Sequence, residues 1–179
     1  MKLERAVALV GLMGVGKSSI GRMLAERLHV PFVDTDDEIE REAGCSIPCI
    51  FEVSGEAGFR SRERRTVARL LGSAQPSVIA TGGGTFVHPA SRKILLERCL
   101  VIWLDADLET LGPRVAAGRE RPLLTGNEPI AALRELALRR NPSYARAHLR
   151  FVSVAAPPEE LVDRIISAIA SFRLPDPAR

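Results

Sequence analysis

Short apolar runs separated by longer amphipathic stretches dominate the pattern of hydrophobic and polar positions along the chain. The first run, Ala6–Val10 (AVALV), is typical of a buried strand, and Ser19–Leu28 has the spacing of an amphipathic helix. The pattern predicts four more strands, a short one from Pro31 that ends in acids and the runs 77–80, 100–104 and 151–154. Because apolar strands alternate with helices, we predict an α/β fold with a parallel sheet covered on both faces.

The connections between these strands predict further helices and one shared ligand edge. The expected helices end at Gly44, run in pieces over Ser46–Leu71 with breaks near Gly55 and Gly58, cover 108–115 and begin again near Pro158. Right-handed crossovers place the carboxyl ends of all parallel strands at one edge of the sheet. We therefore expect the glycine-rich loop at 11–18, the acids at 34 and 36 and the glycines at 82–84 to converge on one cleft.

Length and composition favour a single domain spanning residues 1–179, because a chain of this size buries a continuous core without disulfides or metals. No apolar run reaches the ~18 residues of a membrane helix, so we expect a cytoplasmic protein that does not bind membranes. The net charge is +3, but no Lys/Arg run exceeds two residues, so we expect no nucleic-acid partner. Three cysteines support neither a disulfide framework nor a zinc site, although Cys45 and Cys49 have the spacing of one helix face.

The segment GLMGVGKS, Gly11–Ser18, has the pattern of a phosphate-binding loop and lies between a predicted strand and a predicted helix. Its glycines leave room for backbone N–H groups to approach an anion. In such a loop Lys17 reaches the β and γ phosphates, and Ser18 offers a hydroxyl to Mg²⁺. The alternative is a glycine-rich turn without a ligand, which the combination of loop, strand and helix disfavours.

Three further groups suit the second half of a phosphoryl transfer, and each has a plain structural alternative. Asp34 and Asp36 can divide the tasks of holding metal-bound water and accepting a proton, or one of them can cap the next helix. Arg60 can bind an anion while Glu63 holds it, or the two can form a surface salt bridge. The glycines 82–84 suit close backbone approach to a ligand, or form a flexible turn.

These motifs, in this order and spacing, resemble the shikimate kinases over roughly Val7–Val154. The matching strings are GxxGxGKS, GRxLA, FVDTDxxIE, SIxxIF, GExxFRxxE, ATGGG, RPLL and RxPxY. The resemblance implies a three-layer P-loop kinase fold with a five-stranded parallel sheet in the order 2-3-1-4-5. It also implies a mobile lid at about 112–126, an acceptor-binding region at about 34–62, and transfer of the γ-phosphate of ATP to the 3-hydroxyl of shikimate, a step toward chorismate and the aromatic amino acids.

The resemblance assigns a role to each matching residue. ATP binding falls on Gly14, Val15, Gly16, Lys17, Ser18, Ser19, Arg114, Arg121 and Pro157, with Pro158 as the alternative to Pro157 beside adenine. Shikimate binding falls on Asp36, Arg60, Gly82, Gly83, Gly84 and Arg140, where RxPxY selects Arg140 over Arg139. The Mg²⁺ site falls on Ser18 and Asp34. Catalysis falls on Lys17, on Asp36 as base, and on Arg121 as a lid arginine that stabilises the phosphoryl group in transfer.

Two other functions share part of this pattern. Kinase-like domains of the family also serve as ligand sensors in transcription regulators, but we expect no room for a DNA-binding region beside a domain that runs from Ala6 to about Phe172. Another small-molecule kinase, such as a gluconate kinase, shares the phosphate loop but not the paired arginines Arg60 and Arg140. The expected enzyme is therefore a shikimate kinase, most simply a monomer, with ATP and shikimate as its ligands and Mg²⁺ as its cofactor.

Overall fold

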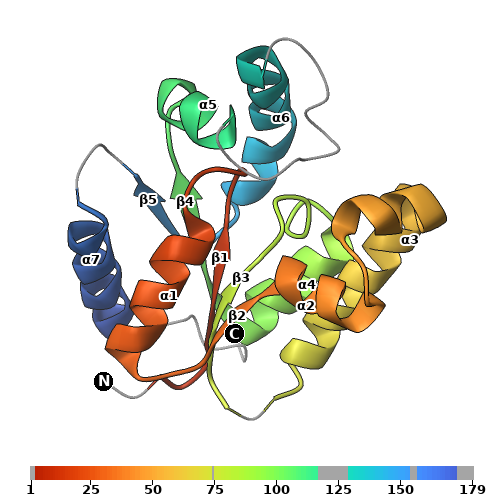
Figure 1. Ribbon diagram of the computed structural model, residues 1–179. Coiled ribbons are helices and arrows are strands. Elements are labelled where there is room, and N and C mark those ends of the chain that lie inside the picture. The colour runs from red at the N-terminus through yellow and green to blue at the C-terminus, as the bar shows by residue number, and fades with distance from the viewer. Residues whose placement is uncertain (1–2, 74, 117–128, 154–156, 173–179) are drawn as a thin grey trace.

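Five parallel strands form one sheet in a computed structural model that describes residues 3–73, 75–116, 129–153 and 157–172 (Figure 1). The strands are β1 (Ala6–Val10), β2 (Phe32–Asp34), β3 (Val78–Ala80), β4 (Cys99–Asp105) and β5 (Leu149–Val152). Their order is β2-β3-β1-β4-β5, which confirms the predicted 2-3-1-4-5 sheet. The central strand β1 pairs in parallel with both neighbours, so that Val7 lies between Val78 of β3 and Leu100 of β4.

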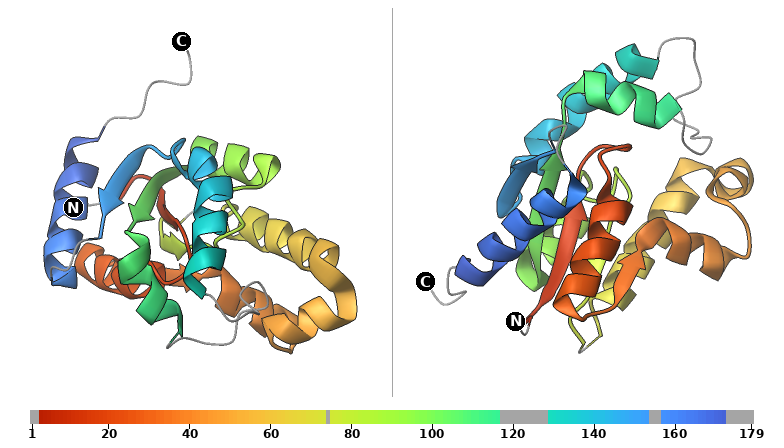
Figure 2. Two further views of the ribbon diagram at one scale, coloured as in Figure 1. Left: turned by 90° about the horizontal axis from the view of Figure 1, so that it is seen from above. Right: turned by 60° about the vertical axis from the view of Figure 1, so that its left-hand side comes forward.

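Helices connect the strands and cover the sheet on both sides. They are α1 (Lys17–Leu28), α2 (Thr35–Ala43), α3 (Ile47–Leu70), α4 (Pro89–Arg98), α5 (Leu108–Ala116), α6 (Pro129–Tyr144) and α7 (Pro158–Ser171). The crossover from β1 to β2 and the crossover from β3 to β4 run in opposite directions, so right-handed connections place α1 and α4 on opposite faces. Helix α7 returns to the face of α1, and the two helices lie side by side (Figures 1 and 2).

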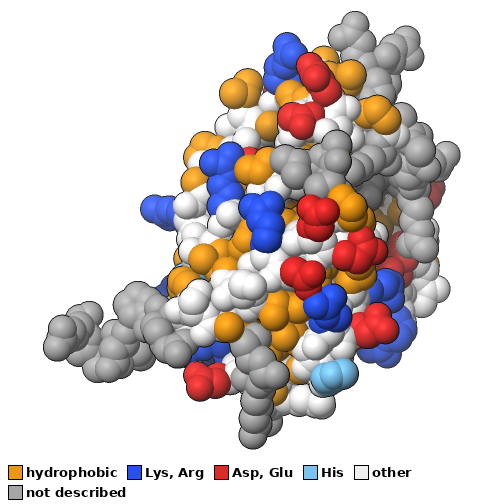
Figure 3. Space-filling model, turned by 90° about the vertical axis from the view of Figure 1, so that its left-hand side faces the viewer, with side chains coloured by type: hydrophobic (Ala, Val, Ile, Leu, Met, Phe, Trp, Pro, Cys, Tyr) orange, Lys and Arg blue, Asp and Glu red, His pale blue; other side chains and the backbone are white. Residues whose placement is uncertain are grey.

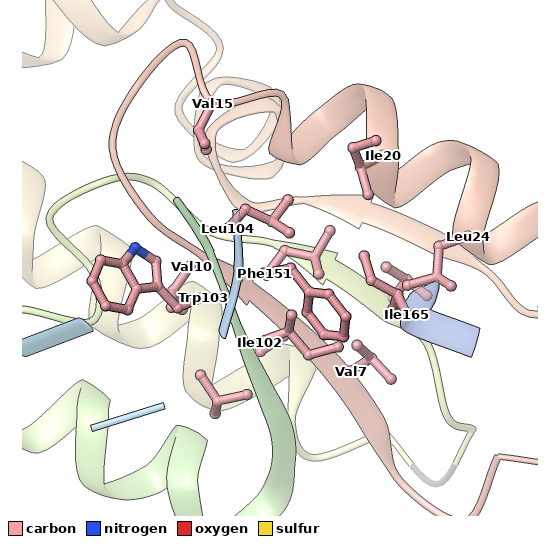
Figure 4. Close-up of a cluster of buried hydrophobic side chains, with 14 of the residues drawn as sticks. Val7, Val10, Val15, Ile20, Leu24, Ile102, Trp103, Leu104, Phe151 and Ile165 are labelled. Carbon is pink, nitrogen blue, oxygen red and sulfur yellow. The ribbon is translucent and has the colours of Figure 1, made fainter. Parts of the chain in front are cut away.

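The main core lies between the sheet and these helices. Figure 4 shows Leu24 of α1 and Ile165 of α7 beside Val7 and Ile102 of the central strands, and all four side chains are buried. The strands β1, β3 and β4 are almost wholly buried, which explains why they read as continuous apolar runs rather than as alternating ones. Burial on both faces fixes the central strands and therefore the position of the loops at their carboxyl ends.

The surface that carries α1 and α7 has charges of both signs beside exposed hydrophobic side chains (Figure 3). Figure 3 shows acidic and basic side chains interspersed on this face, and Arg27 of α1 pairs there with Asp163 of α7. Within the described ranges, every helix is too short or too polar to cross a lipid bilayer.

Several boundaries differ from the sequence prediction. Helix α1 begins at Lys17, and β5 ends at Val152, two residues before the predicted end of that strand. Helix α2 begins at Thr35, so Asp36 lies in its first turn rather than at the end of a strand. The helices α4 and α6 were not predicted. Their apolar residues follow no strong helical period; in α6 the apolar side chains of Ile130 and Leu138 are exposed, while Leu133 is buried.

The break in α3 is at Gly55 and not at Gly58. Gly55 has φ 64° and ψ −178°, a conformation that interrupts the helix and that side chains rarely adopt. Gly58 is helical, and its lack of a side chain serves packing instead, since a Cβ there would lie 2.4 Å from the Cβ of Ser54. The prediction of a helix in pieces is therefore right at one of the two glycines.

Candidate active site

The loop from Gly11 to Gly16 joins the carboxyl end of β1 to the start of α1, as the phosphate-loop pattern predicts. Gly11, Gly14 and Gly16 all have positive φ, and a Cβ at Gly11 would lie 2.2 Å from the carbonyl oxygen of Leu104. The conformation and the packing of this loop thus require glycine. The Lys17 Nζ donates hydrogen bonds to the carbonyl oxygens of Gly11 at 3.0 Å and Leu12 at 2.8 Å, which holds the cation beside the loop.

A cavity of about 470 Å³ lies over this loop and the N-terminus of α1. Its walls include the loop, the ends of β2 and β3, and one face of α7. The described lining residues are Gly14, Val15, Gly16, Lys17, Ser18, Ser19, Ile20, Asp34, Asp36, Thr81, Gly82, Gly83, Val152, Ser153, Pro158, Glu160, Leu161 and Arg164. Backbone N–H groups at a helix N-terminus and a lysine are the groups that suit this cavity to an anion.

Asp34 connects the loop to α2. One of its oxygens accepts a hydrogen bond from Ser18 Oγ at 2.6 Å, and the other accepts from the backbone N–H of Asp36 at 3.0 Å. Asp34 is therefore the N-cap of α2, so the capping alternative is right for this residue, and it still presents one oxygen to Ser18. A serine hydroxyl and a carboxylate 2.6 Å apart are the hard oxygen ligands that Mg²⁺ prefers, so this pair fits the expected cation.

A second cavity, of about 550 Å³, adjoins the first. It combines an apolar side, formed by Met13, Ile47, Pro48, Phe51 and Phe59, with a charged side that contains Asp36, Asp37, Glu40, Arg60, Glu63 and Arg140. Ser18, Asp34, Asp36, Gly82 and Gly83 line both cavities. The predicted convergence of the phosphate loop, the acids and the glycine loop is thus confirmed, and these shared residues form the border between two ligand spaces.

The glycines 82–84 allow charged side chains to contact their backbone. A Cβ at Gly82 would lie 2.7 Å from Asp36 Oδ1, and one at Gly83 would lie 2.9 Å from Arg140 Nη1. A Cβ at Gly84 would lie 2.4 Å from Arg60 Nη1, with the rest of the guanidinium within 2.7 Å. The three glycines are therefore a contact surface for one carboxylate and two guanidinium groups. This packing favours a contact role for the three glycines over the alternative of a merely flexible turn.

Arg60 is held by a buried carboxylate. Its Nη1 donates to both oxygens of Glu63 at 3.0 and 3.2 Å, and Glu63 is only 1% exposed. The Thr85 hydroxyl donates to the same carboxylate at 2.7 Å, while Glu56 pairs with Arg60 from the surface. The Arg60–Glu63 pair predicted from sequence exists, but it is part of the cavity wall rather than a surface salt bridge.

Arg140 reaches the same wall from α6. Its guanidinium is largely buried, and Tyr144, one turn later on the helix, donates a hydrogen bond to the carbonyl oxygen of Gly83. Burial raises the pKa of Tyr144 to about 12, and the neighbouring Arg140 opposes that rise. The phenol thus stays protonated and remains a donor over the physiological pH range.

Some predicted site residues fall where no side-chain placement is given. Arg121 and most of the expected lid lie outside the described residues, and so does the side chain of Arg114. Pro158 lines the first cavity, over the glycine-rich loop. Pro157, exposed at the N-cap of α7, is absent from the described lining of that cavity.

Sequence reasoning missed several residues that line the site or support its lining. Thr85 and Tyr144 were passed over because each is remote in sequence from its partner in the site. On α7 the lining residues Glu160, Leu161 and Arg164 share one helix face with Pro158, and that spacing could have identified them once the helix was known to border the cavity.

Comparisons with known proteins agree on one family. The family model described as shikimate kinase matches residues 13–170. A shikimate kinase from Novosphingobium aromaticivorans is 46% identical over 171 residues, which cover 94% of this chain and 89% of that protein. A solved shikimate kinase from Acinetobacter baumannii, in complex with shikimate, superposes with a TM-score of 0.90 and 37% identity over 95% of each chain. A gluconokinase from Sinorhizobium meliloti reaches a TM-score of 0.64 at 18% identity, over 95% of this chain and 94% of that one, a likeness of fold alone.

Proposed function

The chain belongs to the shikimate kinase family, and we propose that it transfers the γ-phosphoryl group of ATP to the 3-hydroxyl of shikimate. The observation that carries the proposal is the pair of adjoining cavities with a common border of Ser18, Asp34, Asp36, Gly82 and Gly83. A phosphate-binding loop lines one cavity, and two arginines line the other. Such an arrangement suits in-line transfer between two bound substrates, which needs positioning and charge stabilisation more than covalent chemistry.

On the donor side, the loop amides and Lys17 bind the phosphates of ATP. Lys17 now donates to the carbonyls of Gly11 and Leu12, so its ammonium group already lies at the loop where the β and γ phosphates bind. The positive charge there offsets the negative charge that moves onto the ADP leaving group during transfer.

On the acceptor side, Arg60 and Arg140 bind the carboxylate of shikimate, and Asp36 orients its 3-hydroxyl. Two guanidinium groups on one wall pair well with a planar carboxylate, because each offers parallel N–H donors. Asp36 Oδ1 lies against Gly82 at the border of the two cavities. There it accepts the hydroxyl proton as the oxygen bonds to the γ phosphorus, while the bond from that phosphorus to the bridging oxygen breaks and ADP departs.

We assign the Mg²⁺ site to Ser18 and Asp34, whose oxygens lie 2.6 Å apart at the border of the cavities. A bound Mg²⁺ neutralises phosphate charge at this border. This assignment is compatible with the capping of α2, because the cap uses the other oxygen of the Asp34 carboxylate.

The remaining assignments extend this proposal. Arg121 closes over the phosphates from the lid and Arg114 flanks adenine, with Pro158 rather than Pro157 on the opposite side, since Pro158 lines the cavity. We propose a single domain that acts as a monomer, because the described residues of one chain line both cavities. A cytoplasmic location fits an enzyme that consumes ATP.

Two alternatives remain as outcomes of the test. A ligand-sensing module would bind shikimate without turnover, and a gluconate kinase would prefer an acceptor of different shape. Arg60, fixed by the buried Glu63, and Arg140 argue for an acceptor held by its carboxylate.

A coupled ADP-release assay with purified protein, ATP and Mg²⁺ tests the function. We expect turnover with shikimate, little with gluconate or other hydroxy acids, and loss of turnover when EDTA removes the metal. Turnover on another acid but not on shikimate would refute the substrate assignment. Binding of shikimate without ADP release would support the sensing module instead.

A further inference from the structure

The hydroxyl of Tyr144 lies between two parts of the acceptor wall. The ring is fully buried at the end of α6, the hydroxyl donates to the carbonyl oxygen of Gly83, and the Arg140 guanidinium lies close enough to lower the pKa of the phenol. Arg140 and Tyr144 are one helical turn apart, so both side chains point to the same side of α6. The phenol therefore connects a substrate-binding arginine to the glycine loop.

Gly83 is the residue through which this connection reaches the donor side. It lines both cavities, and the position of a Cβ on it would be 3.6 Å from the Gly11 carbonyl oxygen and 3.7 Å from the Tyr144 hydroxyl. The Gly11 carbonyl in turn accepts a hydrogen bond from Lys17. Gly83 thus lies close to Gly11 at the start of the phosphate loop, and it accepts the hydrogen bond of Tyr144.

The rest of the Tyr144 side chain serves packing. Its ring lies against Trp103 of β4, with centroids 6.0 Å apart and planes tilted by 37°. A phenylalanine would keep this contact and lose only the hydroxyl. The hydroxyl is therefore available for a role separate from the core.

We propose that Tyr144 is a positioning residue for the phosphoryl transfer, whose hydroxyl holds Gly83 and Arg140 in the register that aligns the acceptor with the donor. This inference rests on the proposed function. It goes beyond that function because Tyr144 is absent from the described lining of both cavities and acts only through residues that are present there.

The test is Tyr144→Phe, compared with Ser91→Ala as a control that removes another buried hydroxyl, on α4, away from both cavities. Without the phenol hydroxyl the Gly83 peptide and Arg140 are no longer fixed before shikimate binds, and restoring the order that this hydrogen bond gave should weaken shikimate binding about 5- to 10-fold. We expect the KM for shikimate to rise by that factor. The KM for ATP should stay within about twofold, because Arg140, which Tyr144 positions, lines only the second cavity. In the control, both KM values should be those of the wild type.

The pattern of kinetic constants separates positioning from mere support of the fold. A lower Tm with both KM values unchanged would assign Tyr144 to stability alone and overturn the proposal. Equal rises in both KM values would also overturn it, because the hydroxyl would then have no selective effect on the acceptor. Absence of turnover in the wild type would instead refute the proposed function.

A second measurement does not depend on the variant folding. Tyr144 is the only tyrosine in the sequence, so growth with 3-fluorotyrosine labels this position alone for ¹⁹F NMR. We expect the resonance to shift when the otherwise unchanged protein is saturated with shikimate without nucleotide, because the acceptor moves the Gly83 peptide and Arg140. A resonance that stays in place at saturating shikimate would overturn the proposal.

Discussion

Replacing Gly84 with alanine should weaken the acceptor site while leaving the fold intact. The guanidinium of Arg60 lies over Gly84, and an added Cβ would be 2.4 Å from Nη1, about 1 Å short of the 3.4 Å at which ordinary contacts begin. Gly84 has no positive φ, so alanine introduces no backbone strain there. The new methyl group must therefore displace the end of the Arg60 side chain.

The size of the effect follows from what Arg60 loses. Hydrogen bonds to a charged group contribute about 1.5–3 kcal/mol each, so a guanidinium displaced from the substrate carboxylate should raise the KM for shikimate roughly 10- to 150-fold. Arg60 can keep contact with Glu63 by rotating its flexible side chain, and alanine lowers the entropy of the unfolded chain by the equivalent of about 0.4–1 kcal/mol. We therefore expect the free energy of unfolding to change by less than about 2 kcal/mol.

Steady-state kinetics with each substrate varied in turn, together with urea unfolding, checks this prediction. The matched control is Gly72→Ala beyond the end of α3, where a Cβ would meet the Arg69 carbonyl at 3.2 Å and no residue of either cavity. Its KM values should stay within about twofold of the wild type. If Gly84→Ala bound shikimate as tightly as the wild type does, the assignment of Arg60 to the substrate carboxylate would be wrong.

Three further predictions test other parts of the structure. Asp36→Asn should lower kcat by about 10²- to 10⁴-fold, because the amide keeps the shape of the side chain but cannot accept the proton. The affinity for ADP, measured by calorimetry, should change little. Full residual activity would remove Asp36 from the chemistry. His148 Nδ1 accepts a hydrogen bond from the backbone N–H of Val101 at 3.0 Å, and burial, aided by Arg5, lowers the pKa of His148 below its ordinary 6.5. Its contribution to stability is thus present above pH 6.5 and lost as the pH falls through the lower folded-state pKa. The urea midpoints at about pH 7.5 and pH 5 should therefore differ more in the wild type than in His148→Gln. Equal differences in the two proteins would refute this. Cys99 is fully buried and burial raises its pKa to about 12, so a thiol reagent should modify Cys45 and Cys49 in the folded protein but Cys99 only after unfolding; rapid loss of all three thiols without denaturant would contradict this burial.

Local patterns in the sequence were sufficient where local chemistry decides the structure. The apolar run at β1 followed by the glycine-rich loop predicted the strand, the loop and the following helix correctly, because these three elements are adjacent in the chain. Glu63 was paired correctly with Arg60 because residues three apart on a helix are neighbours. Asp34 was predicted near the metal or as a cap, and the structure shows the cap and a hydrogen bond to Ser18.

The remainder depends on contacts between residues that are far apart in sequence. Thr85 was missed because its partner Glu63 lies 22 residues earlier, and Tyr144 because Gly83 lies 61 residues earlier. No periodicity in a single sequence contains such pairings. The helices α4 and α6 also gave only weak patterns, since their apolar residues do not gather on one helix face.

The sequence by itself determined the phosphate loop, the order of the strands by resemblance, and the identity of most charged residues in the cleft. The phosphate loop and the charged residues follow from residue type and local spacing, whereas the strand order followed from the family resemblance alone. Only the tertiary structure decided that Asp36, Arg60 and Arg140 all pack against one run of three glycines, and that Tyr144 holds its centre. The physical reason is that a parallel sheet brings the ends of distant strands to one edge, and which side chains touch there depends on packing within a few tenths of an ångström.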